Sequence, residues 1–160
     1  MKMWNSLVLF AVLSPSAVAQ TVEVKAKPLT DADIQLMRQD VQAQKNQIIT
    51  DTMKFSESEA AAFWPVYKEY AAEQQSIAAK RLNVILDYAR NIEKMDDPKA
   101  HDLSQRMFAI DDEIQSLRKT YFPRFEKALR AKRAAKFYQV DNRLSLIVNF
   151  QLSSEIPLIP

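Results

Sequence analysis

Few residues in this chain could carry out chemistry. His101 is the only histidine, and the chain contains no cysteine and no glycine. There is no basis for a histidine-based triad, a zinc site with two histidines or a di-iron site with two Glu-x-x-His motifs. Nucleotide-binding loops that depend on glycine are also absent. We therefore expect no enzyme activity, no cofactor and no bound metal, and we interpret His101 as an exposed helix residue.

Aromatic residues gather around two prolines, Pro65 and Pro123. Aromatic groups at helical spacing usually pack in a core, whereas an exposed cluster would form an apolar floor for unfolded or amphipathic partners. Neighbours such as Phe63 and Trp64 cannot both face the same side of a helix, so one of them must point toward another helix or solvent. The candidate partner-binding residues of this cluster are Phe63, Trp64, Tyr67, Tyr70, Tyr121, Phe122 and Phe125.

Basic residues are concentrated in the same part of the sequence. The formal net charge of the chain is only +2, so this local excess stands out. One interpretation is a solvated helix surface; the other is a patch that attracts acidic proteins or anionic lipid. A near-neutral exported chain does not suggest a nucleic-acid partner. The candidate residues are Arg118, Arg124, Arg130, Lys132 and Arg133.

The absence of glycine favours an all-helical fold, because tight hairpin turns and bulges depend on positive φ angles. A first helix is predicted to begin at Thr30 and to end near Thr52. Thr30 can cap its first free N–H groups. Apolar residues at helical spacing are expected to form its buried face, namely Ile34, Met37, Val41 and Ile48.

A second, longer helix is predicted from Glu57 to Lys94. Ser56 and Glu59 match a capping box, in which the serine accepts from the third amide and the glutamate reaches back. Steps of three and four residues then continue over four heptads, as in a coiled coil. This predicted seam contains Phe63, Tyr67, Tyr70, Gln74, Ile77, Arg81, Val84, Tyr88, Ile92 and Met95.

A short turn follows, in which Asp97 can cap a third helix and Pro98 occupies its first position. Two long periodic helices joined by a short turn predict an antiparallel hairpin. The third helix continues the seam with Leu103, Met107, Ile110, Ile114, Leu117 and Tyr121. Folding about the turn brings Arg81 near Asp111 or Asp112, where it would form an ion pair. Alternatively, Arg81 extends to water along the edge of the seam.

Both arms of the hairpin contain a proline at a similar distance from the turn. Kinks are therefore predicted at Pro65 and Pro123, which would give a curved hairpin with a C-terminal helical segment after Pro123. The final residues, 156–160, contain two prolines and are expected to lie extended over the base of the bundle. The predicted fold is thus all-α: a long hairpin with a short N-terminal helix and a C-terminal helix.

The first residues have the three parts of a secretory signal peptide: basic Lys2, an apolar run over 7–13, and a small-residue cleavage site. We predict a signal peptide over 1–19 with cleavage between Ala19 and Gln20, a flexible leader over 20–29 and one helical domain over 30–160. The apolar run is too short to span a bilayer. A periplasmic location follows, without a transmembrane segment in the mature chain.

The sequence resembles the Spy/CpxP-type periplasmic proteins, which carry LTxxQ motifs. Phe55-Ser56-x-x-Glu59 stands where Leu-Thr-x-x-Gln would be, and residues 129–133 keep the leucine of a second copy. Residues 63–67 and 139–144 are also similar to a divergent branch of short exported helical proteins. The resemblance implies a curved hairpin that shields unfolded clients without ATP, or that takes part in an envelope-stress response.

The expected function is thus that of a periplasmic ATP-independent chaperone or envelope-stress accessory protein. The alternative is a regulatory or structural adaptor that binds one specific envelope protein. The heptads suit an intramolecular hairpin and an intermolecular coiled coil equally, so a homodimer is compatible with both functions.

Overall fold

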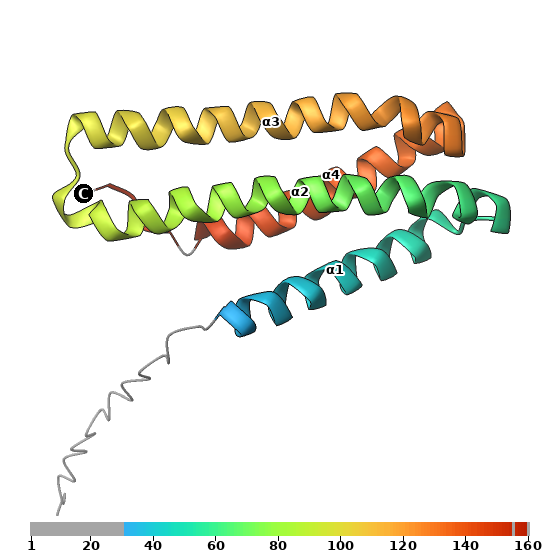
Figure 1. The fold of residues 1–160 in the computed structure, drawn as a ribbon, viewed down its shortest axis with the longest axis horizontal. Helices are drawn as coiled ribbons and strands as arrows, with labels where there is room; N and C mark the ends of the chain where they lie inside the picture. Colours follow the sequence, from blue (N-terminus) through green and yellow to red (C-terminus); the bar gives the residue numbers. More distant parts are fainter. Residues whose placement is uncertain (1–30, 155, 160) are drawn as a thin grey trace, which may run out of the picture.

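The structure is a computed structural model that describes residues 31–154 and 156–159. The predicted signal peptide, its cleavage site at Ala19 and Gln20, the leader and Thr30 lie outside the described residues. The all-helical prediction is confirmed, and no strand occurs in the described part of the chain (Figure 1). The elements are α1 (Asp31–Met53), α2 (Glu57–Asn91), a 3₁₀ turn η1 (Ile92–Lys94), α3 (Asp97–Leu129) and α4 (Ala131–Ser154).

The start of α2 is fixed by the predicted capping box. The Ser56 hydroxyl accepts from the Glu59 amide at 3.3 Å, and the Glu59 carboxylate accepts from the Ser56 amide at 2.9 Å. These two bonds satisfy amides that an α-helix leaves without internal partners. The capping prediction is therefore confirmed.

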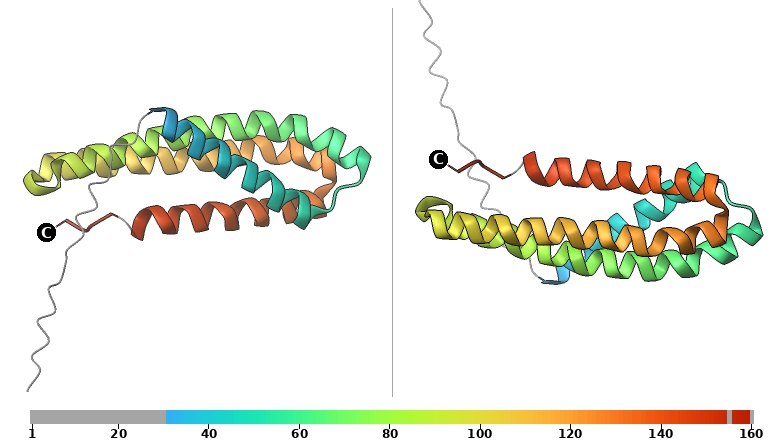
Figure 2. Two further views of the ribbon diagram at one scale, coloured as in Figure 1. Left: turned by 90° about the horizontal axis from the view of Figure 1, so that it is seen from below. Right: turned by 90° about the horizontal axis from the view of Figure 1, so that it is seen from above.

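α2 and α3 lie side by side and run in opposite directions (Figures 1 and 2). The turn between them differs by one residue from the prediction. Asp96, not Asp97, caps α3: its carboxylate accepts from the Lys99 amide at 2.8 Å, and Pro98 stands second in the helix. Buried residues of the predicted seam that face each other in this pair include Tyr70, Ile77, Val84, Leu103, Ile110, Leu117 and Tyr121.

Both inner prolines lie within continuous helices. α2 runs through Pro65, and α3 runs through Pro123 as far as Leu129. The predicted start of a new segment at Pro123 is therefore wrong, since the break falls at Arg130, whose φ is 63°. Packing over both long helices compensates for the hydrogen bond that each proline removes. A bend of the helix axis at the prolines stays a prediction.

The predicted buried face of α1 is wrong at Val41 and Ile48, and the side chains of Ile34 and Met37 lie outside the described part of the structure. Val41 and Ile48 are 46% and 43% exposed, whereas Ile49 and Met53 are fully buried. The reason lies in the tertiary structure, since α1 crosses the α2–α3 pair obliquely and packs against α4 near the Met53 end (Figure 2). Toward its N-terminal end α1 diverges from α4.

Cationic side chains from α4 hold the end of α1. Arg133 donates to the carbonyl oxygen of Met53 at 2.9 Å, and Lys136 donates to that of Thr52 at 2.7 Å. These are carbonyls of the last helical turn, which lack internal partners and carry the negative end of the helix dipole. α4 thus caps α1 at long range.

The C-terminal tail lies at the end of the bundle that contains the α2–α3 turn. The Tyr88 hydroxyl donates to the Pro157 carbonyl oxygen at 2.6 Å. Ile156 and Ile159 line a small apolar pocket together with Val84, Met95 and other residues of α2 and α3. None of the helices in the described part of the chain is long and apolar enough to cross a membrane.

Candidate functional site

The predicted aromatic cluster is the core of the protein. Five of its members are at most 3% exposed: Phe63, Tyr67, Tyr70, Tyr121 and Phe125. Phe137 of α4 completes the cluster, with its ring centroid 4.5 Å from that of Phe125 and 4.9 Å from that of Phe63. These rings hold α2, α3 and α4 together, and the core interpretation of the cluster is therefore the correct one.

The two remaining members, Trp64 and Phe122, are partly buried. The Trp64 ring meets those of Phe63 and Phe55 edge to face, at centroid distances of 5.1 and 6.0 Å. Phe122 packs in the same way on Tyr138 of α4. As predicted, one aromatic residue of each adjacent pair thus points away from the α2–α3 seam.

The predicted basic patch is divided among several roles. Arg124 pairs with Glu69 at 2.7 Å and covers the Tyr121 ring, while Arg133 pairs with Glu59 at 2.5 Å. Arg118 turns inward, and its side chain is only 11% exposed. Arg124, Arg130 and Lys132 are exposed, and of these three Arg124 is held by its ion pair with Glu69. The stretch therefore does not act as a single charged surface.

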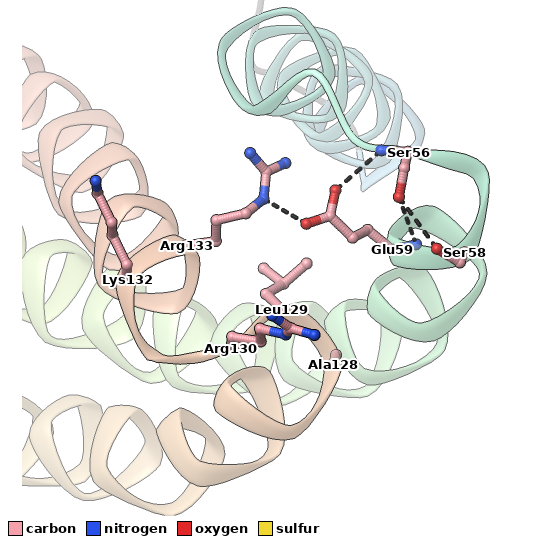
Figure 3. A pocket seen from close by; sticks show the side chains of 8 residues that line it. All are labelled: Ser56, Ser58, Glu59, Ala128, Leu129, Arg130, Lys132 and Arg133. Carbon is pink, nitrogen blue, oxygen red and sulfur yellow. Dashed lines mark hydrogen bonds and ion pairs between the residues drawn. The ribbon is translucent and has the colours of Figure 1, made fainter.

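Arg130, Lys132 and Arg133 line a pocket of about 530 Å³ at the α1–α2 turn (Figure 3). The Glu59 carboxylate on its opposite side is bonded to both Ser56 and Arg133. The polar groups drawn in Figure 3 thus mainly stabilise the turn. Arg130 and Lys132 form no ion pair with the other residues shown there.

A second space of about 530 Å³ has a different character, and we call it the central groove. It is bounded by residues of α1, α2, α3 and α4. Its rim includes Val41, Leu146 and Val148, which are 46%, 59% and 37% exposed. Its apolar lining also includes Ile77, Ala78, Leu82, Ile85, Ile114 and Leu144.

Two cations lie at the inner side of the central groove, Lys45 from α1 and Arg118 from α3. Both face Asp141 of α4, which is 1% exposed. Its carboxylate oxygens lie 4.0 Å from Lys45 Nζ and 4.0 Å from Arg118 Nε, respectively. Tyr70 of α2 donates to Asp141 Oδ2 at 2.8 Å. Side chains from all four helices therefore meet at one buried carboxylate.

Burial dominates the titration of this cluster. It lowers the pKa of Lys45, and the nearby Asp141 carboxylate opposes this effect only in part. Burial also raises the pKa of Tyr67 to about 12 and raises that of Tyr70, with the Asp141 charge adding to both shifts. These directions are those expected when a charged form loses hydration. Both tyrosines therefore remain neutral hydrogen-bonding groups at ordinary pH.

At one side of the central groove, Arg81 forms an ion pair with Asp111 and donates to Met107 Sδ at 3.2 Å. This confirms the predicted pairing and selects Asp111 over Asp112. The Arg81 side chain is 23% exposed, so it follows the seam and reaches its partner at the edge. His101 is exposed on α3, as predicted.

The sequence interpretation missed Lys45 and Asp141, and with them the central groove. A signal was present for Asp141, since it stands in the apolar stripe of α4 between Phe137 and Leu144. A charged residue in such a stripe requires partners, as Arg81 does in the seam of α2 and α3. Lys45 had no comparable signal, because its burial depends on the angle at which α1 crosses the bundle.

Comparisons of the chain with protein-family models, with curated proteins and with solved structures found no match. The function must therefore be argued from the site itself. Within residues 31–154 and 156–159, no group of three or more histidine, aspartate or glutamate side chains is placed to hold a metal ion. The central groove combines apolar walls with two inward cations.

Proposed function

We propose that this protein is an exported, ATP-independent binding protein of the periplasm that holds unfolded or amphipathic polypeptide segments in the central groove. The observation that carries the proposal is the apolar rim of Val41, Leu146 and Val148, which remains exposed beside an apolar lining. Exposed apolar residues that border an apolar-lined groove are typical of an interaction site. No chemical step is part of the proposed function.

The location of the site differs from the one predicted from sequence. The aromatic residues near Pro65 and Pro123 are mostly buried and none of them lines the groove, so they are not part of the proposed contact surface. Bends at the two prolines belong to the same proposal, because a curved α2–α3 hairpin would follow the surface of a client. The resemblance to Spy/CpxP-type proteins supports this shape and this class of function.

Suppression of aggregation tests the proposal directly. The purified mature protein, at severalfold molar excess over a chemically denatured client, is expected to reduce light scattering in the absence of ATP. Leu146→Asp is expected to weaken this effect, because it places a charge on the apolar rim. Ile147→Asp is the matched control, since Ile147 is similarly exposed, at 56%, and does not line the groove.

The result that would remove the proposal is unchanged client scattering at every ratio of protein to client. If Leu146→Asp and Ile147→Asp weaken the suppression of aggregation equally, the groove is not the binding site, although the chaperone activity itself stands. Export is tested separately by cell fractionation and N-terminal sequencing, which should find the mature chain in the periplasm beginning at Gln20.

The alternative function is a regulatory or structural adaptor for one envelope protein, with or without homodimer formation. Apolar residues outside the groove favour it, since Phe150 and Leu158 are 75% and 89% exposed. Affinity capture from an envelope extract separates the two functions. A chaperone should recover many clients, and an adaptor should recover one partner in a fixed ratio.

A further inference from the structure

The charge inside the central groove is not balanced. Lys45 and Arg118 bring two positive charges, and their side chains are 14% and 11% exposed. Within the described part of the chain, the carboxylate that pairs with them is Asp141, at 4.0 Å from each. Arg81 and Asp111, which also line the groove, neutralise each other. One positive charge near Asp141 is therefore uncompensated.

The hydrogen-bonding capacity of Arg118 is also incompletely used. Its Nε atom is buried and has no hydrogen-bond partner among the described residues. A guanidinium has five N–H donors in a rigid fork, and leaving a buried donor unpaired is unfavourable. Asp141 Oδ2 accepts from Tyr70 at 2.8 Å and Asp141 Oδ1 is buried without a hydrogen-bond partner, so among the described residues neither oxygen bonds the Arg118 Nε–H directly. An additional acceptor beside Arg118 would supply the missing interaction.

We propose that the central groove selects acidic amphipathic polypeptide segments, whose Glu or Asp carboxylate binds Arg118 and Lys45 while flanking apolar side chains contact Val41, Leu146 and Val148. This inference rests on the proposed function and adds a chemical preference to it. Carboxylates match the fork of an arginine in a bidentate geometry, and such charge-assisted bonds are about twice as strong as neutral ones.

The form of the groove favours a polypeptide over a small amphiphile such as a fatty acid. Sites for small molecules cover about 70–90% of their ligand. Here the rim residues are 37–59% exposed, so the groove opens along α1 and α4 and leaves one side of an occupant in water. An amphipathic helix has a polar side to place there, whereas an acyl chain has none.

The test uses three labelled amphipathic peptides that differ only at one central position, which is Glu, Gln or Lys. Fluorescence anisotropy with the full mature protein measures their dissociation constants. The Glu peptide is expected to bind at least about tenfold more tightly than the Gln peptide, and the Lys peptide to bind most weakly. Higher salt should reduce these differences.

Variants of the protein connect this preference with the named cations. Arg118→Met and Lys45→Met each keep an apolar stem and are expected to reduce the Glu-to-Gln ratio severalfold. Arg124→Met is the matched control, because Arg124 lies on the same helix and pairs with Glu69 away from the groove. Circular dichroism establishes that each variant is folded. The comparison of peptides on the unmodified protein stands even if Arg118→Met does not fold.

The possible failures are distinguishable. Equal binding of all three peptides would overturn the acidic preference and leave the proposed function intact. Binding of none would overturn the proposed function and the preference with it. Displacement of the Glu peptide by oleate at an equal or lower concentration would overturn the choice of a polypeptide as the occupant.

Discussion

The hydroxyl of Tyr70 donates a 2.8 Å hydrogen bond to the carboxylate of Asp141, which lies 71 residues later in the chain. Tyr70 belongs to α2 and Asp141 to α4, and both side chains are buried. Lys45 of α1 and Arg118 of α3 approach the same carboxylate. This single polar contact therefore marks the point where the four helices meet beneath the central groove.

Removing the Asp141 carboxylate should be strongly destabilising. Asp141→Ala leaves Lys45 and Arg118 buried without an opposite charge, and it deprives Tyr70 of its acceptor. We expect the free energy of unfolding to fall by about 3 kcal/mol, as measured by urea denaturation. Asp112→Ala, at an exposed position of α3, is the control and should change it by less than about 0.5 kcal/mol. Equal effects of the two substitutions would contradict this account.

Alkaline pH should weaken the fold through Tyr67. Its pKa is about 12 in the folded protein, against 10.0 for a tyrosine that is not buried. Between these two pH values the folded state therefore retains a proton that the unfolded state loses. This stabilisation is fully present below pH 10 and disappears as the pH rises through 12, and it amounts to about 3 kcal/mol. Comparing the unfolding free energy of the unmodified protein with that of Tyr67→Phe isolates it. The difference should be constant at neutral pH and should shift in favour of the variant above pH 10.

The Arg81–Asp111 ion pair should contribute more to thermal stability than the neighbouring Lys80–Glu113 pair, whose cation is more exposed. The Arg81 side chain is 23% exposed, whereas the Lys80 and Glu113 side chains are 54% and 41% exposed. Arg81→Glu opposes like charges at the seam and should lower the melting temperature by several degrees. Lys80→Glu should lower it by about one degree or less, since exposed pairs contribute little. An unchanged melting curve for Arg81→Glu would remove this pair from the stabilising contacts.

The break between α3 and α4 should tolerate glycine better than any other residue. Arg130 has φ 63° and ψ 158°, a region that is unfavourable for a side chain with a Cβ atom. Arg130→Gly should therefore raise the free energy of unfolding by about 1 kcal/mol. Arg130→Ala keeps the Cβ atom and should give no gain. A loss of stability with glycine would show that the arginine side chain contributes more than the strain costs.

The C-terminal tail should protect apolar surface near the α2–α3 turn. Ile156 lines the pocket formed with Val84 and Met95, whereas Leu158 is 89% exposed. Ile156→Asp is expected to release the tail and increase the fluorescence of the apolar dye ANS. Leu158→Asp should leave the fluorescence unchanged. A similar increase with both variants would mean that the tail does not cover this pocket.

The sequence by itself determined those features that depend on short-range chemistry. Ser56 and Glu59 begin α2 because two orphan amides and two side-chain acceptors lie within one helical turn. The seam from Phe63 to Tyr121 follows from a period of three and four residues, and the position of Arg81 in it required the partner found at Asp111. The lack of glycine and the short turn before Pro98 likewise predicted long helices from local sequence alone.

The tertiary structure alone decided where α1 packs, and with it the candidate site. Val41, predicted to be buried, forms the exposed rim of the groove, while Lys45 on the same helix is drawn toward Asp141. Local periodicity cannot fix these roles, because the buried face of α1 depends on its crossing angle over the bundle and on the contacts from Arg133 and Lys136 of α4. Such contacts join residues about 80 positions apart, as for Arg133 with Met53, and no local pattern encodes that pairing.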